Sequence, residues 1–151
     1  MNGVNILEVK FRKATDKDIY EIVDLCNECF FENTDHEKAL KVFQETKDKN
    51  NIYLIGEVDG KIVSHAKITI IPTIYERMGI YAILNHVCVK PEYRRHKIAT
   101  KMLDEISKIC IARDCKVMEL WSNNVRKAAH ACYRNYGFKL DDAGFFSKEI
   151  I

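Results

Sequence analysis

The sequence predicts an α+β fold: one domain over residues 1–151, with a mixed, mostly antiparallel sheet flanked by helices. Three observations support this prediction. Segments that alternate apolar and polar residues take turns with segments of helical period along the chain. Asp59-Gly60 joins two apolar runs, as in a tight β-hairpin. A length of 151 residues and a hydrophobic content of 47% allow one buried core.

The first two elements are a strand and a helix. Leu7 to Arg12 alternates as a strand does, and Thr15 follows as a helix cap, with Asp16 and Asp18 in the first turn. The helix is expected to bury an apolar stripe, which consists of Ile19, Ile22, Val23, Cys26 and Phe30.

A second helix and a hairpin come next. The helix is predicted from about Asp35 to Lys47, with Leu40 and Phe43 facing inward. The hairpin consists of two predicted strands, Ile52–Val58 and Lys61–Ile71.

The second half of the chain starts with a central strand. Tyr81 to Val89 is mostly apolar, as a strand covered on both faces should be. A helix from about His96 to Arg113 and a strand from Val117 to Trp121 follow. The buried face of this helix has the i, i+3, i+4, i+7 spacing and comprises Ala99, Met102, Leu103, Ile106, Ile109 and Cys110.

A short helix and two strands are predicted to close the chain. Asn123 or Asn124 caps the helix, which ends at Tyr136, and Gly137 supplies the left-handed residue beyond it. The two strands are Phe138–Leu140 and Phe145–Glu149.

Composition excludes several classes of function. With 24 Lys and Arg against 22 Asp and Glu, the chain carries no broad field for nucleic acid. No apolar stretch has the length of a signal-peptide core or a membrane span, so a cytoplasmic location is expected. Six cysteines then indicate free thiols in a reducing compartment. Cys26 and Cys29 have the spacing of a metal pair, but no second pair matches them, and we expect buried thiols and no metal.

Val87 to Met102 is the most informative stretch. An apolar strand ends at Pro91, a short loop carries Arg94 and Arg95, and an amphipathic helix starts at once. The first N–H groups of a helix lack intrahelical partners, and the helix dipole attracts negative charge there. A strand, a cationic turn and a helix N-terminus in this order therefore predict a site for a phosphate-bearing cofactor.

Three segments carry a resemblance to a known family. Leu84–Arg95 is similar to a central strand and its exit, and Arg94–Ala99 to a pyrophosphate loop with the pattern Gln/Arg-x-x-Gly-x-Gly/Ala. Ala128–Phe138 is similar to the motif Ala-x-x-x-Tyr-x-x-x-Gly-Phe. In this order they resemble the Gcn5-related N-acetyltransferase (GNAT) family. The resemblance implies the acyl-CoA N-acyltransferase fold and acetyl-CoA as the co-substrate, whose acetyl group moves to an amine.

The resemblance also implies how acetyl-CoA binds. The backbone of Val87, Cys88 and Val89 should pair with the pantetheine arm like an added strand, and an N–H near Val87 or Cys88 should polarise the thioester carbonyl. Arg94 should contact the pyrophosphate, and Asn124 should contact CoA besides capping a helix. The pyrophosphate should also lie on the backbone N–H groups of Arg95, His96, Lys97, Ile98, Ala99 and Thr100.

Lys97 departs from the family pattern, which has glycine here. Glycine lets the backbone approach phosphates closely. A lysine with negative φ still fits the first turn of a helix, so the N–H cradle can survive. The Lys97 ammonium group either contacts a phosphate or points to solvent, and a degraded loop with weak cofactor binding is the third alternative.

The resemblance assigns Tyr133 as the general acid that protonates the departing CoA thiolate, with core packing as the alternative.

Many members of the family have a glutamate base where this chain has Asn85, which cannot accept a proton. His86 can act as the base directly or through water. Adjacent strand residues face opposite sides unless the strand bulges, and a core role for His86 is equally compatible. Trp121 is expected in the core.

Direct acetyl transfer is expected, because no cysteine is recognisably paired with a histidine as a nucleophile. The expected acceptor is the primary amine of a small molecule. The chain is similar to a divergent protozoan branch of the glucosamine 6-phosphate N-acetyltransferases, which makes this sugar phosphate the first choice of acceptor. The cations available for its phosphate are Lys67, Arg77, Arg126, Lys127 and Arg134.

Other functions and partners stay open. The alternative acceptors are aminoglycoside, polyamine or peptide amines, and a CoA-binding module without catalysis is the alternative class of function. No nucleic acid or membrane partner is expected. A homodimer formed through the C-terminal strands is compatible with Phe145 and Phe146, which could equally belong to the core.

Overall fold

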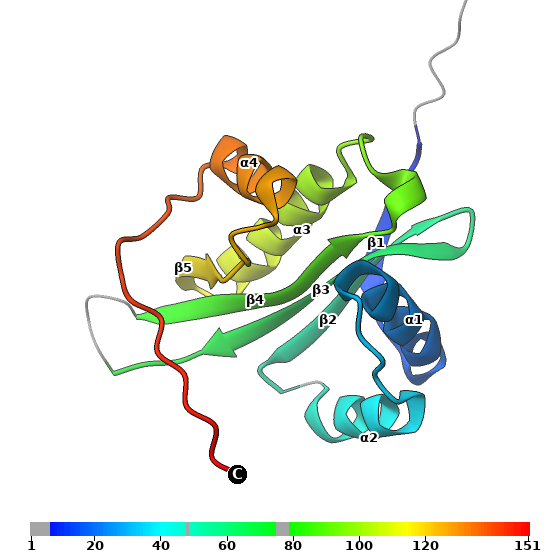
Figure 1. The fold of residues 1–151 in the computed structure, drawn as a ribbon, viewed down its shortest axis with the longest axis horizontal. Helices are drawn as coiled ribbons and strands as arrows, with labels where there is room; N and C mark the ends of the chain where they lie inside the picture. Colours follow the sequence, from blue (N-terminus) through cyan, green and yellow to red (C-terminus); the bar gives the residue numbers. More distant parts are fainter. Residues whose placement is uncertain (1–6, 48, 75–78) are drawn as a thin grey trace, which may run out of the picture. The chain divides into compact units, whose positions relative to one another are not determined.

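Figure 1 shows the fold in a computed structural model of the chain. The structure describes residues 7–47, 49–74 and 79–151. The chain divides into two compact units, Met1–Trp121 and Ser122–Ile151. The first unit holds the sheet, and the second holds one α-helix among its residues.

The described part of the first unit is built on a five-stranded sheet, in which the strand order follows the sequence. The strands are β1 (Lys10–Lys13), β2 (Asn51–Val58), β3 (Lys61–Ile71), β4 (Ile80–Val89) and β5 (Cys115–Leu120). β1 to β4 run antiparallel, and β5 is parallel to β4. A parallel pair needs a crossover connection, which contains α3 (Ile98–Ala112). The predicted mixed, mostly antiparallel sheet is confirmed.

Helices cover both faces of this sheet, as predicted (Figure 1). After the single turn η1 (Asp16–Asp18), α1 (Ile19–Phe30) and α2 (His36–Thr46) lie on one face. Their apolar residues form one buried cluster with Ile55, Ile62 and Cys88 of the sheet. α3 covers the opposite face, where Ile98 packs with Val58 and Val63.

Local sequence patterns predicted α2, the hairpin turn and β3 correctly. Phe43 is buried in the α1/α2 cluster and Leu40 packs against it, as expected. The hairpin turn has positive φ at both Asp59 (50°) and Gly60 (76°), the conformation that a tight two-residue turn requires. β3 has the predicted bounds, Lys61–Ile71.

The second unit contains α4 (Lys127–Tyr136), which ends at Gly137 with a left-handed φ of 113°. The Phe138 N–H donates to the Tyr133 carbonyl at 2.9 Å, which closes the helix end as predicted. The start of the helix was predicted wrongly. Asn123 accepts from the Val125 N–H at 3.0 Å in a turn before the helix, and α4 begins only after Arg126.

The two predicted C-terminal strands are wrong. Residues 138–151 form neither helix nor strand and belong to no ladder of the described sheet. A strand forms only where a neighbouring strand supplies the backbone hydrogen bonds, and no local sequence pattern specifies that neighbour. Phe145 and Phe146 are 72% and 93% exposed, so core packing of these residues is also wrong.

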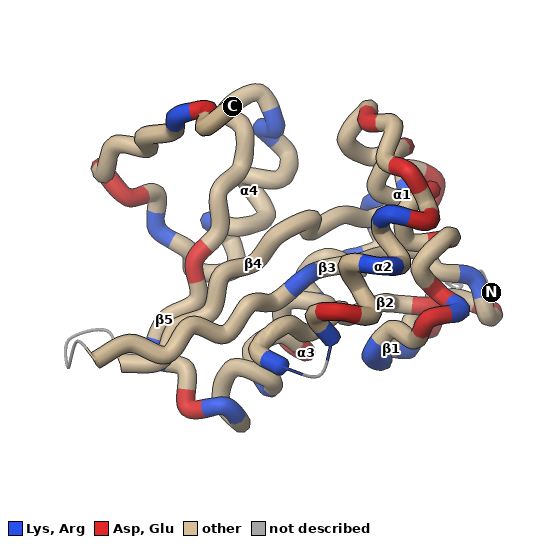
Figure 2. Tube along the Cα trace, turned by 90° about the horizontal axis from the view of Figure 1, so that it is seen from below, with Lys and Arg blue, Asp and Glu red and all other residues tan. Residues whose placement is uncertain are grey.

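Trp121 was expected in the core, but it is 60% exposed and lies just beyond β5, which ends at Leu120. Figure 2 shows Lys and Arg interspersed with Asp and Glu along the trace, whereas β4 carries no charged residue. This mixture agrees with the absence of a broad positive field in the described part of the chain.

None of the described helices has the length and apolar character needed to cross a membrane.

Candidate active site

β4 has two halves with different neighbours. Tyr81 to Leu84 pair with β3 on one side and with β5 on the other, as far as Leu84 opposite Leu120. Asn85 to Val89 continue along β3 but lie beyond the last described residue of the β5 ladder. An open backbone edge inside a sheet can receive an extended ligand as an added strand. Sequence reasoning places the pantetheine arm along this edge, at Val87, Cys88 and Val89.

A bulge interrupts the second half of β4. Cys88 lies opposite His65 and Asn85 opposite Lys67, so three steps along β4 match two steps along β3. His86 lies in the bulge and adopts a left-handed φ of 56°. A bulge of this kind re-aims side chains and shifts the alternation of the residues that follow.

The bulge brings Asn85 and His86 to the same face of the sheet. The His86 ring lies 6.2 Å from the ring of Phe30 in α1. Asn85 lies opposite Lys67 of β3, and directly opposite residues share a face of the sheet. Lys67 Nζ is 5.7 Å from the ring of Tyr53, which packs against the cluster beneath α1 and α2. Both residues therefore face α1 and α2, although adjacent residues of a regular strand would face opposite sides.

The surroundings of His86 keep its imidazole neutral. The side chain reaches solvent, yet partial burial lowers the pKa of His86 below the ordinary value of 6.5. The Glu32 carboxylate opposes this shift and the Lys67 ammonium group adds to it. At pH 7 the ring is therefore mostly unprotonated and can accept a proton.

The loop between β4 and α3 contains two left-handed residues. After the turn η2 (Pro91–Tyr93), φ is 66° at Arg95 and 59° at Lys97, which is the N-cap residue of α3. The expectation of a negative φ at Lys97 is therefore wrong. The loop follows a path that suits glycine, and here a lysine adopts it at a conformational cost.

α3 presents its N-terminus to this loop. The Lys101 N–H donates to the Lys97 carbonyl at 3.0 Å, so the N–H groups of Ile98, Ala99 and Thr100 precede this first helical bond. The buried Ile98 side chain anchors the end of the helix on the sheet. Unpaired N–H groups and the positive end of the helix dipole together can bind an anion.

Arg94 folds back toward β4. Its Nε donates to the Val89 carbonyl at 3.2 Å, and its Nη2 lies 3.9 Å from Cys29 Sγ. Lys90 Nζ pairs with Glu28 Oε2 at 2.8 Å. These contacts tie the exit of β4 to the last turns of α1. A guanidinium group has five N–H donors, so Arg94 retains donors for a phosphate, and Arg95 is exposed beside it.

The second unit holds the remaining predicted residues. Tyr133 is 8% exposed, and its ring stands edge-on 5.8 Å from the ring of Phe138. His130 Nε2 contacts the Ser122 carbonyl at 3.1 Å, which ties α4 to the turn before it. Asn124 is exposed in that turn.

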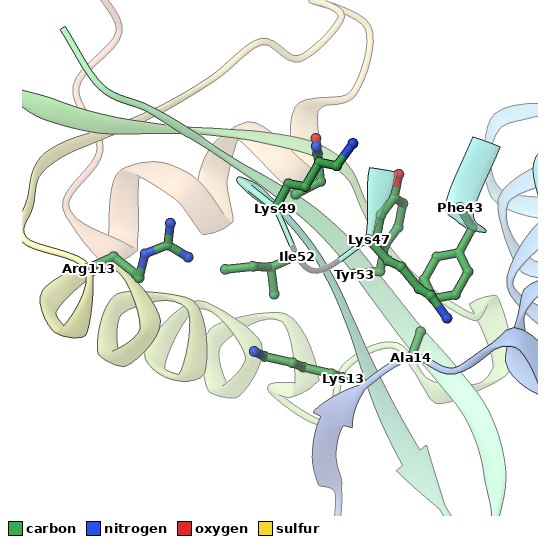
Figure 3. Close-up of a pocket in the computed structure, with 9 residues that line it drawn as sticks. Lys13, Ala14, Phe43, Lys47, Lys49, Ile52, Tyr53 and Arg113 are labelled. Carbon is green, nitrogen blue, oxygen red and sulfur yellow. The ribbon is translucent and has the colours of Figure 1, made fainter. Parts of the chain in front are cut away.

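A separate hollow of about 160 Å³ lies beside the first residues of β2 (Figure 3). Its cationic side chains are Lys13, Lys47, Lys49 and Arg113. Arg113 Nη2 donates to Asn50 Oδ1 at 2.8 Å, and Lys47 Nζ pairs with Asp16 Oδ1 at 3.0 Å. Lys47 and Arg113 directly follow α2 and α3, where a cation complements the negative helix end. None of the described residues predicted to bind acetyl-CoA lines this hollow.

Sequence reasoning missed Phe30, Glu32 and Cys29 as neighbours of the site. Cys29 and Phe30 end α1 and Glu32 follows it. Only the folded chain brings them to β4, so no local pattern indicated them. Arg77, proposed for the substrate phosphate, lies outside the described residues. Within the part of the chain that the structure describes, no three His, Cys, Asp or Glu side chains are arranged to hold a metal ion.

Known proteins share this architecture. The model of the acetyltransferase (GNAT) family matches residues 19–138, which include β4, the loop, α3 and Tyr133. A transcriptional regulator from Bacillus halodurans C-125 superposes with a TM-score of 0.86 at 21% identity, over 94% of this chain and 100% of that chain. A predicted acetyltransferase with acetyl-CoA from Clostridium acetobutylicum gives 0.77 at 22% identity, over 93% and 96%.

A third similar structure is the glucosamine-6-phosphate N-acetyltransferase from Arabidopsis thaliana. It superposes with a TM-score of 0.78 at 18% identity, over 95% of this chain and 99% of that chain. At these identities the likeness shows the fold. The fold predicted from the sequence is confirmed, and the family match extends over more than half of the chain.

Proposed function

Because the chain belongs to the GNAT acetyltransferase family, we propose that it moves the acetyl group of acetyl-CoA directly to the primary amine of a small molecule. The first choice of acceptor is glucosamine 6-phosphate, which would give N-acetylglucosamine 6-phosphate. One observation carries the proposal: the open, bulged half of β4 runs into a loop and the N-terminus of α3.

This arrangement suits the two ends of acetyl-CoA. The amide groups of an extended pantetheine arm can hydrogen-bond to the backbone of Val87, Cys88 and Val89. The pyrophosphate then meets the N–H groups of residues 98–100 and the guanidinium groups of Arg94 and Arg95. Lys97 adds an ammonium group at the same helix end. An N–H near Val87 or Cys88 serves as the donor to the thioester carbonyl as it gains negative charge.

Acetyl transfer needs a base and an acid. The acceptor amine must lose a proton as it attacks, and the neutral His86 imidazole is the base, directly or through a water molecule. Asn85, on the same face, cannot take the proton but can orient the amine by a hydrogen bond. Tyr133 is the acid, because a phenol with a pKa of about 10 can protonate a CoA thiolate of pKa about 8.5 or higher.

Charges beside His86 suit an acceptor with an ammonium and a phosphate group. Glu32 and Lys67 both influence the His86 pKa, so a carboxylate and an ammonium group lie close to the base. The sequence also suggested Arg126, Lys127 and Arg134 as phosphate contacts, and these stay predictions. The similar Arabidopsis structure is named as a glucosamine-6-phosphate N-acetyltransferase, which supports this choice. Membership of the divergent protozoan branch remains part of the proposal.

Turnover of acetyl-CoA tests the proposal. Purified protein is mixed with acetyl-CoA and one amine at a time: glucosamine 6-phosphate, glucosamine, kanamycin, spermidine or a short peptide. Release of free CoA thiol is followed with a colorimetric thiol reagent. We expect the highest kcat/KM with glucosamine 6-phosphate. Equal rates with glucosamine would remove the case for a phosphate contact, and tight CoA binding without turnover would show a binding module.

The Tyr133→Phe variant tests the acid. We expect kcat to fall by about 100-fold while the Kd for CoA changes little, because only proton transfer to the thiolate is lost. Tyr136→Phe, in the same helix, is the matched control and should retain kcat. If kcat is unchanged in Tyr133→Phe, the assignment of the acid is wrong.

A further inference from the structure

Three thiols meet where α1 packs on the second half of β4. Cys26 and Cys29 are one helical turn apart on α1, and both are half-buried. Cys88 is 3% exposed on β4 and belongs to the buried cluster beneath α1, against which Cys26 and Cys29 pack. The acetyl-transfer mechanism uses none of these sulfur atoms. Their arrangement therefore needs another explanation.

Arg94 makes the three thiols unequal. Its Nη2 lies 3.9 Å from Cys29 Sγ, and the Cys29 thiol also contacts the Val89 carbonyl at 3.5 Å. The hydrogen bond from Cys88, aided by the charge of Arg94, lowers the pKa of Cys29 to about 7, although burial opposes the shift. The pKa of Cys88 is raised, mainly by its hydrogen bonds to Cys26 and Cys29 and by burial. Cys29 is thus the more acidic of the two thiols, and Cys88 is its protonated neighbour.

We propose that Cys29 is an oxidation site for hydroperoxides and that Cys88 resolves it to an intramolecular disulfide. The Cys29 sulfur attacks the outer peroxide oxygen, the O–O bond breaks, and a sulfenic acid and an alcohol (water, for hydrogen peroxide) form. The Cys88 sulfur then attacks the Cys29 sulfur, the S–O bond breaks, and the Cys88 proton leaves with the hydroxide as water. Two thiols are oxidised and one hydroperoxide is reduced.

A second pair of neighbouring thiols provides an internal comparison. Cys110 of α3 and Cys115 of β5 are also neighbours, since Cys115 is among the groups that shift the pKa of Cys110. Burial there raises the pKa of Cys110 to about 12, and no cation is among the groups that shift it. Proximity of two thiols is thus common to both pairs, and the cationic Arg94 distinguishes the Cys29 pair. The proposal predicts fast oxidation of that pair only.

Peptide mapping after hydrogen peroxide tests the proposal. The reduced, folded full-length protein is treated at pH 7, quenched with an alkylating agent, and cut with trypsin and a glutamate-specific protease without reduction. Cleavage after Glu28 separates Cys26 from Cys29. We expect a Cys29–Cys88 crosslink, formed about tenfold faster than any change at Cys132 or at the Cys110 and Cys115 pair. A Cys26–Cys88 crosslink, or equal rates at all thiols, would overturn the assignment.

Three variants define the roles of the residues. In Cys88→Ser, Cys29 should stop at the sulfenic acid, which dimedone traps. In Arg94→Gln, oxidation of Cys29 should slow several-fold, because the cation that stabilises the thiolate is gone. Cys132→Ser is the control and should form the crosslink at the wild-type rate. An unchanged rate in Arg94→Gln would show that the arginine does not activate Cys29.

The location of the disulfide predicts a link to acetyl-CoA, and this part rests on the proposed function. Arg94 contacts both Cys29 and the Val89 carbonyl, so a ligand phosphate that draws Arg94 away should slow Cys29 oxidation. Desulfo-CoA, which lacks a thiol, is the probe. A slower crosslink with desulfo-CoA supports the link. An unchanged rate despite bound desulfo-CoA overturns the link, whereas absence of the crosslink in the apoprotein overturns the oxidation site itself.

Discussion

The two halves of β4 show how one strand serves two purposes. Tyr81 to Leu84 pair on both sides, and Ala82 and Leu84 are buried. Asn85 to Val89 pair on one side only, and the left-handed His86 interrupts them. The first half stabilises the fold through regular pairing and burial. The second half gives up regular pairing, and we propose that its backbone groups and the neutral His86 imidazole serve a ligand.

The first prediction concerns the paired half. Leu84→Ala should lower the free energy of unfolding by about 3 kcal/mol, because it removes a side chain that is 1% exposed and leaves a cavity. Chemical denaturation with urea measures this change. Transfer activity per folded molecule should stay near wild type below the unfolding transition. If Leu84→Ala instead abolished activity without loss of stability, the division of β4 into two halves would be wrong.

The second prediction concerns the bulged half. His86→Gln should lower kcat/KM by about 100-fold, because glutamine cannot accept a proton, while the urea midpoint changes little. Activity of the wild-type enzyme should fall at acid pH, since protonation removes the base. The pKa on this acid limb should lie below 6.5, because burial favours the neutral ring. A limb that persists in His86→Gln would show that another group titrates.

The smallest effect is expected in the loop. Lys97→Gly should stabilise the fold by up to about 1 kcal/mol, because glycine adopts the left-handed conformation at lower cost. It should also weaken acetyl-CoA binding several-fold, because an ammonium group beside the pyrophosphate is lost. Isothermal titration calorimetry measures the affinity. Lys97→Ala is the matched control, since it removes the charge and keeps the strain: we expect the same loss of affinity and no gain in stability. Tighter binding by Lys97→Gly would show that the lysine compromises the loop.

Sequence patterns predicted the elements whose signals are local. Asp59-Gly60 and Gly137 fixed a hairpin and a helix end, because each residue type suits one backbone conformation. The bulge at His86 could not be located, because it depends on the register of β4 against β3. The left-handed Lys97 was missed for a related reason: the loop path between β4 and α3 overrides the local preference of lysine. The prediction of two C-terminal strands failed because no local pattern specifies a pairing partner.

The central claim is that the second half of β4 and the start of α3 bind acetyl-CoA. Titration of ¹⁵N-labelled protein with acetyl-CoA, followed by backbone amide shifts, tests it most directly. We predict the largest shifts at Val87–Val89 and Ile98–Thr100, with small shifts at residues 80–84 and around Arg113. Shifts confined to the cationic hollow near Arg113, or no shifts at saturating acetyl-CoA, would contradict the account.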